Sequence, residues 1–438
     1  MNKFLSFLLL ISTLGQNSFA YMLNIDFFKK FNDEYLFSYI VEALENNHDL
    51  KSANHRLEQF KYEINSQFSQ ELPSLSVTGA YLGAHFPKSD TGDFLFIRSN
   101  AFILPFQVKY EPDFLLKNHD KTKSKRKLYT AQLANQKATY ISLLTDVAGV
   151  YFNILLTDYL IKKQIQVLKC KKENLSLTDK KFKNGIVSSI ELNDYRKKYT
   201  NQKLLYDNLI KNQKTMLYSF AVLLGKSPDC INEIKRGKIE NIEYQDTIPK
   251  CISSDTLLNR PDLVEIENKL KSAKIDIKVA RKEFLPNFSI NGIYAMDTAS
   301  GGNFFSWNSV FAILLAGATQ DIFRGGYKIA NLKIKKAKYQ ELFEQYKQAD
   351  LNAIKETNNA LNLIKQDRIS EKSTLYQVFL QNKICKSSQK KLKQGTISKI
   401  EYLDDKATLN SIQQLWASSK TARLVDYVTL YKALGAEL

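Results

Sequence analysis

The residue types that most often carry out catalysis are few in this sequence, and their spacing matches no common catalytic pattern. The chain of 438 residues has four histidines, none of them in an HxxxH pair: His48, His55, His85 and His119. No nucleophile elbow or phosphate-binding loop occurs. The cysteines lie far apart and form no CxxC or Cys/His set of the kind that holds zinc. We therefore expect no enzymatic activity, no cofactor and no metal site.

The four cysteines fall into two pairs by their surroundings. Cys170 and Cys385 lie in helical stretches, where small buried side chains are expected. Cys230 and Cys251 lie in an irregular segment near the middle of the chain. An oxidising compartment permits a disulfide there, and the sequence leaves open whether one forms.

Two short motifs recur at a fixed distance and mark turns between helices. Gly185-Ile186-Val187-Ser188 and Gly395-Thr396-Ile397-Ser398 lie 210 residues apart. Glycine ends a helix, and serine caps the next one. Acidic residues follow both turns, at Glu191, Glu401 and Asp404. The spacing predicts two helical hairpins, each with carboxylates close to its turn.

Long helices must position these turns. No proline interrupts residues 117–182 or 326–392, and a helix of 65 residues extends about 98 Å. Apolar residues follow a seven-residue repeat in both segments, with Asp158 and Glu356 as the only misses. Shorter helices are expected over 31–71, 189–224, 261–284 and 398–434. The pattern is typical of coiled-coil seams.

A second recurring motif marks a change from helix to strand. Leu72-Pro73-Ser74-Leu75 and Leu285-Pro286-Asn287-Phe288 lie 213 residues apart, and alternating apolar residues follow each proline. We predict strands over about 74–86, 100–111, 287–296 and 307–319, in two hairpins. The chain is thus a duplication, with a first repeat over 21–225, a linker over 226–258 and a second repeat over 259–438.

The N-terminus has the features of a secretory signal peptide over residues 1–20: a lysine, an apolar run and small residues before the expected cleavage site. We expect no later segment with the composition of a membrane helix. The net charge of +18 first suggests nucleic acid, but only 10 of the 63 basic residues are arginine. Export and lysine excess favour a solvated helix surface and no nucleic-acid partner.

The two predicted hairpins have strands long enough to cross an outer membrane. Four strands cannot close a barrel, and an open sheet edge in lipid leaves unsatisfied backbone groups. Two or three chains must therefore share one pore. We also expect the heptad seams to have no core within one chain, so that neighbouring copies complete it. A barrel continued by a helical tube is a conduit.

The motifs together resemble the outer membrane factors of the TolC family over nearly all of the mature chain. The pieces that carry the resemblance are the two Leu-Pro motifs, Tyr110-Glu111-Pro112-Asp113-Phe114, Leu257-Leu258-Asn259-Arg260-Pro261-Asp262-Leu263 and Ile322-Phe323-Arg324-Gly325-Gly326. The resemblance implies a mainly α-helical homotrimer with a twelve-stranded β-barrel in outer-membrane lipid and a periplasmic α-helical tunnel. It also implies two partners, a periplasmic adaptor protein and an inner-membrane transporter.

The resemblance also suggests roles for the two turns. In the family such turns meet the adaptor, which here implicates residues 185–188 and 395–398. Acidic residues that narrow the pore entrance correspond to Glu401 and Asp404, with Glu191 equivalent to Glu401. The tyrosine and arginine that latch the entrance correspond to Leu392 and Ile397, so polar latching at these positions is lost. The alternative is that the glycines only end helices and the serines only cap them. The acidic residues would then simply belong to a solvated helix face.

Two further alternatives remain open from the sequence. An exported structural coiled coil without channel activity would explain the heptads and lysines but not the strands between them. Within the channel interpretation, tripartite efflux and type I secretion use similar outer-membrane parts. The sequence does not choose between these two export systems.

Overall fold

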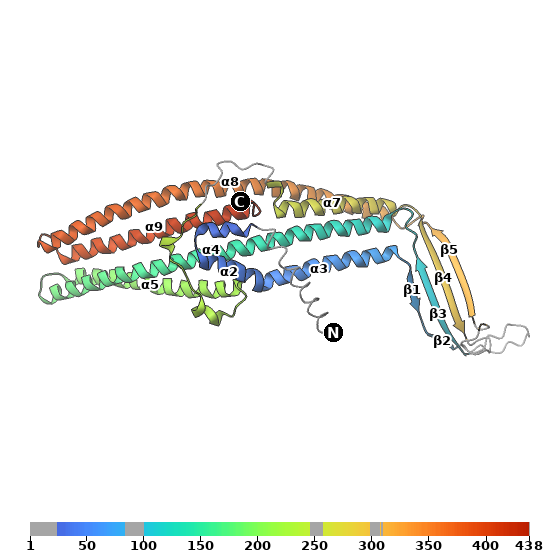
Figure 1. The fold of residues 1–438 in the computed structure, drawn as a ribbon, viewed down its shortest axis with the longest axis horizontal. Helices are drawn as coiled ribbons and strands as arrows, with labels where there is room; N and C mark the ends of the chain where they lie inside the picture. The colour runs from blue at the N-terminus through green and yellow to red at the C-terminus, as the bar shows by residue number, and fades with distance from the viewer. Residues whose placement is uncertain (1–23, 84–99, 246–256, 298–306, 308–309, 438) are drawn as a thin grey trace, which may run out of the picture. The chain divides into compact units, whose positions relative to one another are not determined.

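The structure is a computed structural model that describes residues 24–83, 100–245, 257–297, 307 and 310–437 (Figure 1). The predicted signal peptide and Cys251 lie outside these residues, so cleavage stays a prediction and the pairing of Cys230 with Cys251 stays open. The chain divides into two compact units. Unit 1 comprises residues 1–54, 135–263 and 349–438, and unit 2 comprises residues 55–134 and 264–348.

Unit 2 contains the β-sheet. The strands are β1 (Ser74–Val77), β2 (Ala80–Gly83), β3 (Asn100–Tyr110), β4 (Asn287–Asp297) and β5 (Val310–Thr319). They are antiparallel in the order β1-β3-β4-β5, and β2 also pairs with β3. The predicted first strand is therefore interrupted near Gly79, although Thr78 N still donates to Pro105 O at 3.1 Å. Pairing of β3 with β4 joins the strands of the two sequence halves.

Within the described residues, no strand pairs beyond β1 or β5, and neither apolar core cluster includes a strand residue. In β5 the neighbouring side chains of Leu314 and Leu315 are 74% and 58% exposed, although they lie on opposite faces of the strand. All four residues of β1 at the other end are exposed as well. Five strands in four positions, with exposed apolar side chains, fit a larger closed sheet.

Helical segments complete unit 2 at the base of the strands. The long helices α4 (Lys117–Lys183) and α8 (Tyr327–Lys393) begin there. Asp113 starts α4, because its carboxylate accepts from the N–H groups of Lys117 and His119 at 2.6 and 2.7 Å. α4 is also bonded to α7 (Pro261–Lys282), through Ser124 and Asp276 at 2.7 Å. These buried polar bonds fix which faces of the two helices meet.

The single helix predicted over 31–71 is wrong. The structure has a 3-10 helix η1 (Ile25–Phe31), α2 (Glu34–Asn46), α3 (His48–Phe68) and a short 3-10 turn. Asp33 caps α2 by accepting from Leu36 N at 2.8 Å. Asn47 has an extended backbone and caps α3 by accepting from Asp49 N at 2.8 Å. Aspartate and asparagine are both strong N-cap residues. The two caps were missed in the sequence because the apolar periodicity continues across them.

Unit 1 has a well-packed core, so the expectation of no core within one chain is also wrong. Aromatic residues of η1 pack against α4 and against α9 (Lys399–Ala433), and Phe27 stacks on Tyr431 with ring centroids 4.5 Å apart. The largest fully buried side chains come from η1, α4, α5 (Ser189–Leu223) and α9: Phe27, Phe28, Phe31, Tyr151, Phe152, Phe220 and Tyr431. One 18-residue window of α4 even has the composition of a membrane helix, but 61% of it is buried in this core.

The two heptad misses are attachment points for arginine. Asp158 of α4 accepts from Arg236 at 3.2 Å, and Glu356 of α8 accepts from Arg260 at 2.8 Å. Both arginines come from the chain between α5 and α7. Burial raises the pKa of Asp158 even though Gln213 and Arg236 oppose the shift. The acids thus interrupt the apolar pattern where the connecting segment binds.

The two copies of Leu-Gly end their helices in the same way. Gly225 and Gly435 have positive φ angles of 71° and 65°. Beside them, Asn47 donates to Leu223 O and Arg260 donates to Ala433 O, both at 2.9 Å. A polar side chain just before α3 or α7 thus satisfies a carbonyl at the end of α5 or α9.

We expect Gly225→Ala to destabilise unit 1 strongly. A Cβ atom at Gly225 would lie 2.5 Å from the backbone oxygen of Asn46, in addition to the strain of a left-handed alanine. The expected loss is about 3 kcal/mol or more in the free energy of unfolding. Gly185→Ala is the matched control, because φ is also positive but no atom lies within 4 Å, and it should lose about 1 kcal/mol. Thermal unfolding of the two purified variants measures both losses of stability. Equal losses for Gly225→Ala and Gly185→Ala would contradict the prediction.

Candidate entrance and docking turns

Two glycine turns end the long helices. Gly185 N donates to Phe182 O and Ile186 N donates to Lys181 O, both at 2.9 Å. Gly395 and Thr396 repeat the pattern with Leu392 O and Lys391 O, at 3.1 and 3.0 Å. This pair of bonds is the Schellman motif, and its left-handed residue has φ values of 69° and 74° here. Glycine is the residue that adopts this conformation with the least strain, and at both positions a Cβ atom would meet nothing within 4 Å.

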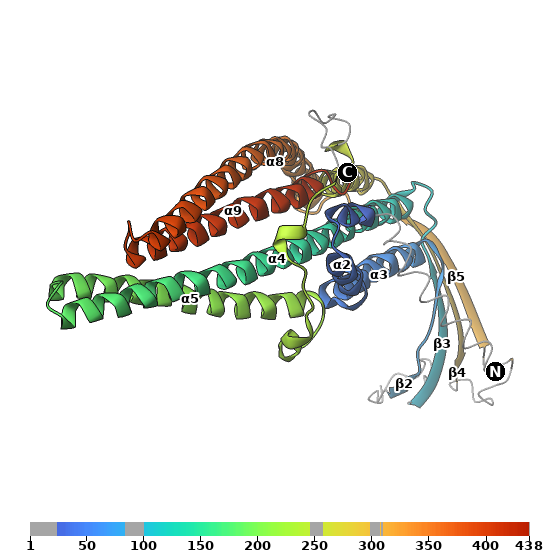
Figure 2. The same ribbon diagram turned by 60° about the vertical axis from the view of Figure 1, so that its left-hand side comes forward.

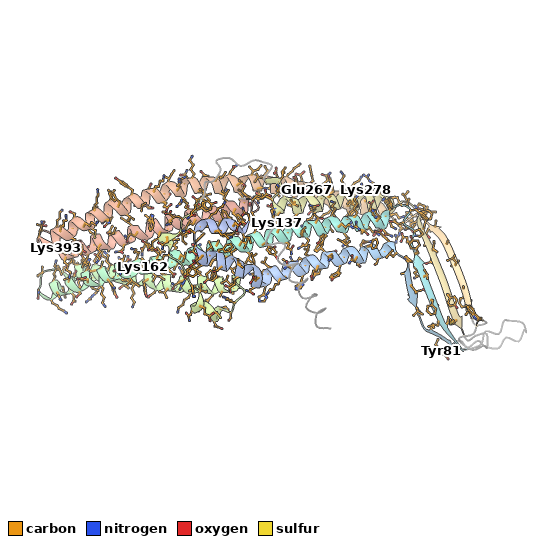
Figure 3. All side chains as sticks on the ribbon, in the orientation of Figure 1. Tyr81, Lys137, Lys162, Glu267, Lys278 and Lys393 are labelled. Carbon is orange, nitrogen blue, oxygen red and sulfur yellow. The ribbon has the colours of Figure 1, made fainter. Side chains whose placement is uncertain are left out.

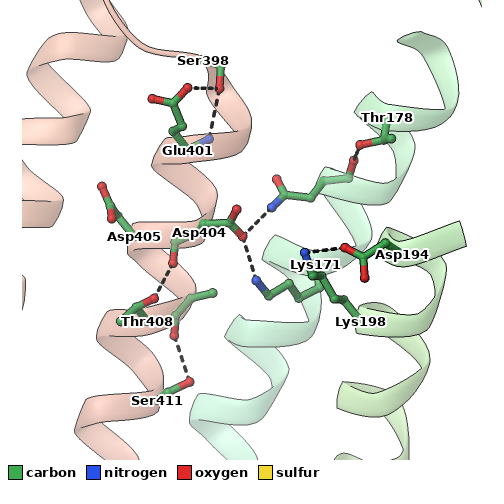
Figure 4. A network of polar contacts seen from close by, with 12 residues as sticks. Lys171, Thr178, Asp194, Lys198, Ser398, Glu401, Asp404, Asp405, Thr408 and Ser411 are labelled. Atoms are coloured by element: carbon green, nitrogen blue, oxygen red, sulfur yellow. Dashed lines mark hydrogen bonds and ion pairs between the residues drawn. The ribbon is translucent and has the colours of Figure 1, made fainter. Parts of the chain in front are cut away.

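The serines of both motifs cap the returning helices as predicted. Ser188 and Ser398 accept from the N–H groups of Glu191 and Glu401, both at 3.2 Å. Ser398 Oγ also donates to Glu401 Oε1 at 3.0 Å (Figure 4). The spacing is that of a capping box. Glu191 and Glu401 therefore have a structural task at the start of α5 and α9, where the helix dipole favours negative charge.

The side chains of the turns are available for contact in the described chain. Ile186 is 68% exposed and the equivalent Thr396 is exposed, whereas Val187 and Ile397 are partly buried. Lysines fill the last turn of α4 and of α8, and Lys393 lies at the end of α8 (Figure 3). The two turns thus combine a small surface of mixed polarity with basic side chains.

Asp404 has partners that sequence reasoning missed. Its Oδ1 accepts from Lys171 Nζ at 2.7 Å and from Asn174 Nδ2 at 2.9 Å, and both donors lie on α4 (Figure 4). Asn174 is fully buried, and the Lys171 and Asp404 side chains are 20% and 43% exposed. The predicted carboxylate is therefore compensated within the chain. We call Lys171, Asn174 and Asp404 the α4–α9 clamp.

Two further contacts hold α9 on α4 beside the clamp. Glu173 forms an ion pair with Lys399. A small apolar cluster of Val167, Cys170, Leu403 and Ala407 packs between the same helices. Lys171 and Asn174 are three residues apart, so they share a face of α4. That spacing was the only signal in the sequence, and lysines are too frequent in this chain for it to stand out.

The neighbouring Asp405 faces α8 instead. It accepts from Ser388 Oγ, and its backbone oxygen accepts from Gln381. Consecutive aspartates thus bond α9 to different helices, Asp404 to α4 and Asp405 to α8. Leu392 and Ile397, which the resemblance aligns with the residues of a polar latch, are both partly buried and apolar.

The remaining candidate groups behave as packing residues. Cys170 and Cys385 are buried as expected, and burial raises the pKa of both thiols. Within the described ranges, no three His, Cys, Asp or Glu side chains are grouped as a metal site would require.

Comparison with known proteins gives a consistent result. The sequence model of the family described as "Outer membrane efflux protein" matches residues 39–226 and 252–436. The cation efflux system protein CusC of Escherichia coli O157:H7 is 25% identical over 413 residues, which cover 92% of this chain and 86% of that protein. The toluene efflux pump outer membrane protein TtgC of Pseudomonas putida is 24% identical, covering 92% and 84%.

Solved structures show the same fold. The CmeC outer membrane channel of Campylobacter jejuni superposes with a TM-score of 0.84 at 23% identity, covering 94% of this chain and 88% of that one. The outer membrane protein VceC of Vibrio cholerae gives 0.79 at 16% identity, covering 94% and 99%. The predicted fold class and the resemblance are confirmed, and the channel interpretation is favoured over the exported coiled coil. With two matched segments that make up most of its length, the chain belongs to the outer membrane efflux protein family.

Proposed function

We propose that three copies of this chain form one outer-membrane channel, continued by a periplasmic helical tunnel, in a tripartite efflux system. The observation that carries the proposal is the open four-position sheet of unit 2, with β1 and β5 at its ends and apolar side chains on both faces of β5. Lipid offers no hydrogen bonds to sheet edges. β1 and β5 have opposite directions, so β5 of one copy can pair in antiparallel fashion with β1 of the next.

Efflux, rather than type I secretion, is supported by the names of the relatives. CusC is named for cation efflux and TtgC for toluene efflux, at nearly equal identity to this chain. Such different cargoes at equal similarity indicate that the outer-membrane component does not select the cargo. We therefore place cargo selection in the inner-membrane transporter and its adaptor.

The adaptor contact is proposed at the two glycine turns, residues 185–188 and 395–398. Both turns are rigidly built by Schellman bonds and serine caps, yet their outer side chains remain exposed. Exposed side chains on a rigid scaffold suit a docking site, because little conformational entropy is lost on binding.

Closure of the tunnel entrance is proposed at the α4–α9 clamp. The family's latch residues are replaced by Leu392 and Ile397, whereas Lys171 and Asn174 hold Asp404 from within the chain. Three copies would repeat the clamp around the pore axis. Opening would then expose the carboxylates of Asp404 and attract cations to the entrance.

Cross-linking tests the shared barrel. With the native cysteines replaced by serine, the pair Ser76→Cys on β1 and Leu315→Cys on β5 should yield covalent trimers on a denaturing gel. The two strands are not paired within the described residues of one copy, so in the proposed barrel they would meet between copies. Neighbouring positions on β5 serve as a register scan. Cross-linking within single copies, or none at any register, would contradict a barrel made of several chains.

Substitution of Ile186 tests docking. Ile186→Glu should reduce cross-linking to the adaptor about tenfold, because it buries a charge in the contact. The tolerance of cells to drugs or metals should fall about tenfold as well. Ile186→Leu is the matched control and should retain both. Both variants should form trimers in detergent, because Ile186 is exposed and outside the core. Normal export by Ile186→Glu would exclude this turn as a contact.

Removal of the clamp tests closure. Lys171→Met or Asp404→Asn should raise the open probability of purified channels in planar bilayers on the order of 100-fold, because three partly exposed ion pairs contribute about 1 kcal/mol each. Asp405→Asn is the control, since Asp405 bonds α9 to α8 and leaves the clamp intact. If all three variants had the same open probability as the unmodified protein, closure would lie elsewhere in the channel.

A further inference from the structure

The antiparallel pairing of α8 and α9 has a regular register. Ser388 of α8 bonds to Asp405 of α9, and Glu371 of α8 pairs with Arg423 of α9. Moving 17 residues back along α8 therefore corresponds to moving 18 residues forward along α9. One helical turn further, the same register brings Asp367 of α8 opposite Asp426 of α9. Two acidic side chains thus face each other between these helices.

Asp426 is deeply buried in this position. Its exposed fraction is 8%, and its Oδ2 atom has no hydrogen-bond partner among the residues that the structure describes. Asp367 is partly buried. An ionised carboxylate with an unpartnered buried oxygen is costly, so a compensating group is expected close by.

The nearby cations are engaged elsewhere. Arg423, one turn before Asp426, pairs with Glu371 and also donates to the hydroxyl of Tyr427 at 3.2 Å. Lys420, one turn earlier again, donates to Glu240 O at 2.9 Å. Glu240, Glu243 and Glu371 act on Lys420, whereas the charge that acts on Asp426 is that of Asp367. No described cation is left to neutralise Asp426.

A proton is the remaining way to relieve the pair. Two ionised carboxylates can only accept hydrogen bonds and repel each other, whereas one proton turns one of them into a donor to the other. Burial, followed by the charge and hydrogen bond of Asp367, raises the pKa of Asp426 to about 7. The protonated pair is therefore populated in a compartment near neutral pH.

We propose that Asp367 and Asp426 share one proton and form a pH-sensitive clasp between α8 and α9. α8 ends and α9 begins at the turn that contains Ser398. The clasp therefore stiffens the helical hairpin that carries this turn. The proposal needs only the packing within one chain. It stands or falls independently of the channel function proposed above.

The direction of the pH effect follows from the raised pKa. The folded state binds the proton more tightly than the unfolded state, in which an aspartate titrates near 3.8. The contribution to stability is therefore complete below about pH 4 and is lost as the pH rises to about 7. Over that window the ratio of folded to unfolded protein falls by up to tenfold per pH unit and per clasp.

Infrared difference spectroscopy of the purified full chain in detergent, between about pH 5 and about pH 8.5, detects the shared proton directly. The unmodified protein should show the carbonyl band of a protonated carboxylic acid that titrates near neutral pH. Asp426→Asn should abolish this band. Asp367→Asn should move its midpoint to lower pH, because the repelling charge is gone. Asp194→Asn, at a site 52% exposed, is the matched control and should leave the band unchanged.

Thermal unfolding over the same pH range gives a second readout. Asp426→Asn should unfold at a higher temperature than the unmodified protein at about pH 8.5, and the difference should shrink toward about pH 5. An unmodified protein without a protonated-acid band above about pH 6 would overturn the proposal. So would an Asp426→Asn variant whose stability has the same pH profile as the unmodified chain.

Discussion

The constraint on which this structure depends is that an open sheet edge needs hydrogen bonds that a membrane cannot supply. In the described part of the chain, one copy contributes four strand positions, its end strands β1 and β5 are each paired on one side, and apolar side chains are exposed on both faces of β5. The rest of the molecule is consistent with this requirement. The strands return to the same base in both halves, and two 67-residue helices continue from them, so that neighbouring copies can share both barrel and tunnel.

Polar residues, together with the aromatic core, determine how the helical part is joined. Asp158 and Glu356 interrupt otherwise regular heptads, and each binds an arginine from the segment that connects the halves (Figure 2 shows this segment beside α4 and α5). Asp404 and Asp405 likewise bond one helix to two different neighbours. Ion pairs of this kind add little net stability but discriminate against other registers, which suits long helices with repetitive apolar faces.

Much of the architecture could be predicted because its signals are local and repeated. Leu72-Pro73 and Leu285-Pro286 marked the change of period, and Gly185 and Gly395 marked the helix ends, all from single residue types with strong backbone preferences. What could not be predicted depends on contacts distant in sequence. The core around Phe27 and Tyr431 joins residues 404 positions apart, and Lys171 is one lysine among many until the fold brings it to Asp404. The break at Asn47 was missed for another reason, since its cap lies inside a continuous apolar pattern.

The paired helix ends at Leu223 and Ala433 have diverged in one respect. A neutral amide from Asn47 holds the first, whereas a nearly buried guanidinium from Arg260, itself bonded to Asp262 and Glu356, holds the second. An ancestral unit present twice would give a ring of six equivalent hairpins in a three-copy assembly. Their anchors now differ in charge and in number of bonds. Adjacent hairpins would therefore differ in how firmly their helix ends are held, and the motion of the ring would have three-fold rather than six-fold symmetry.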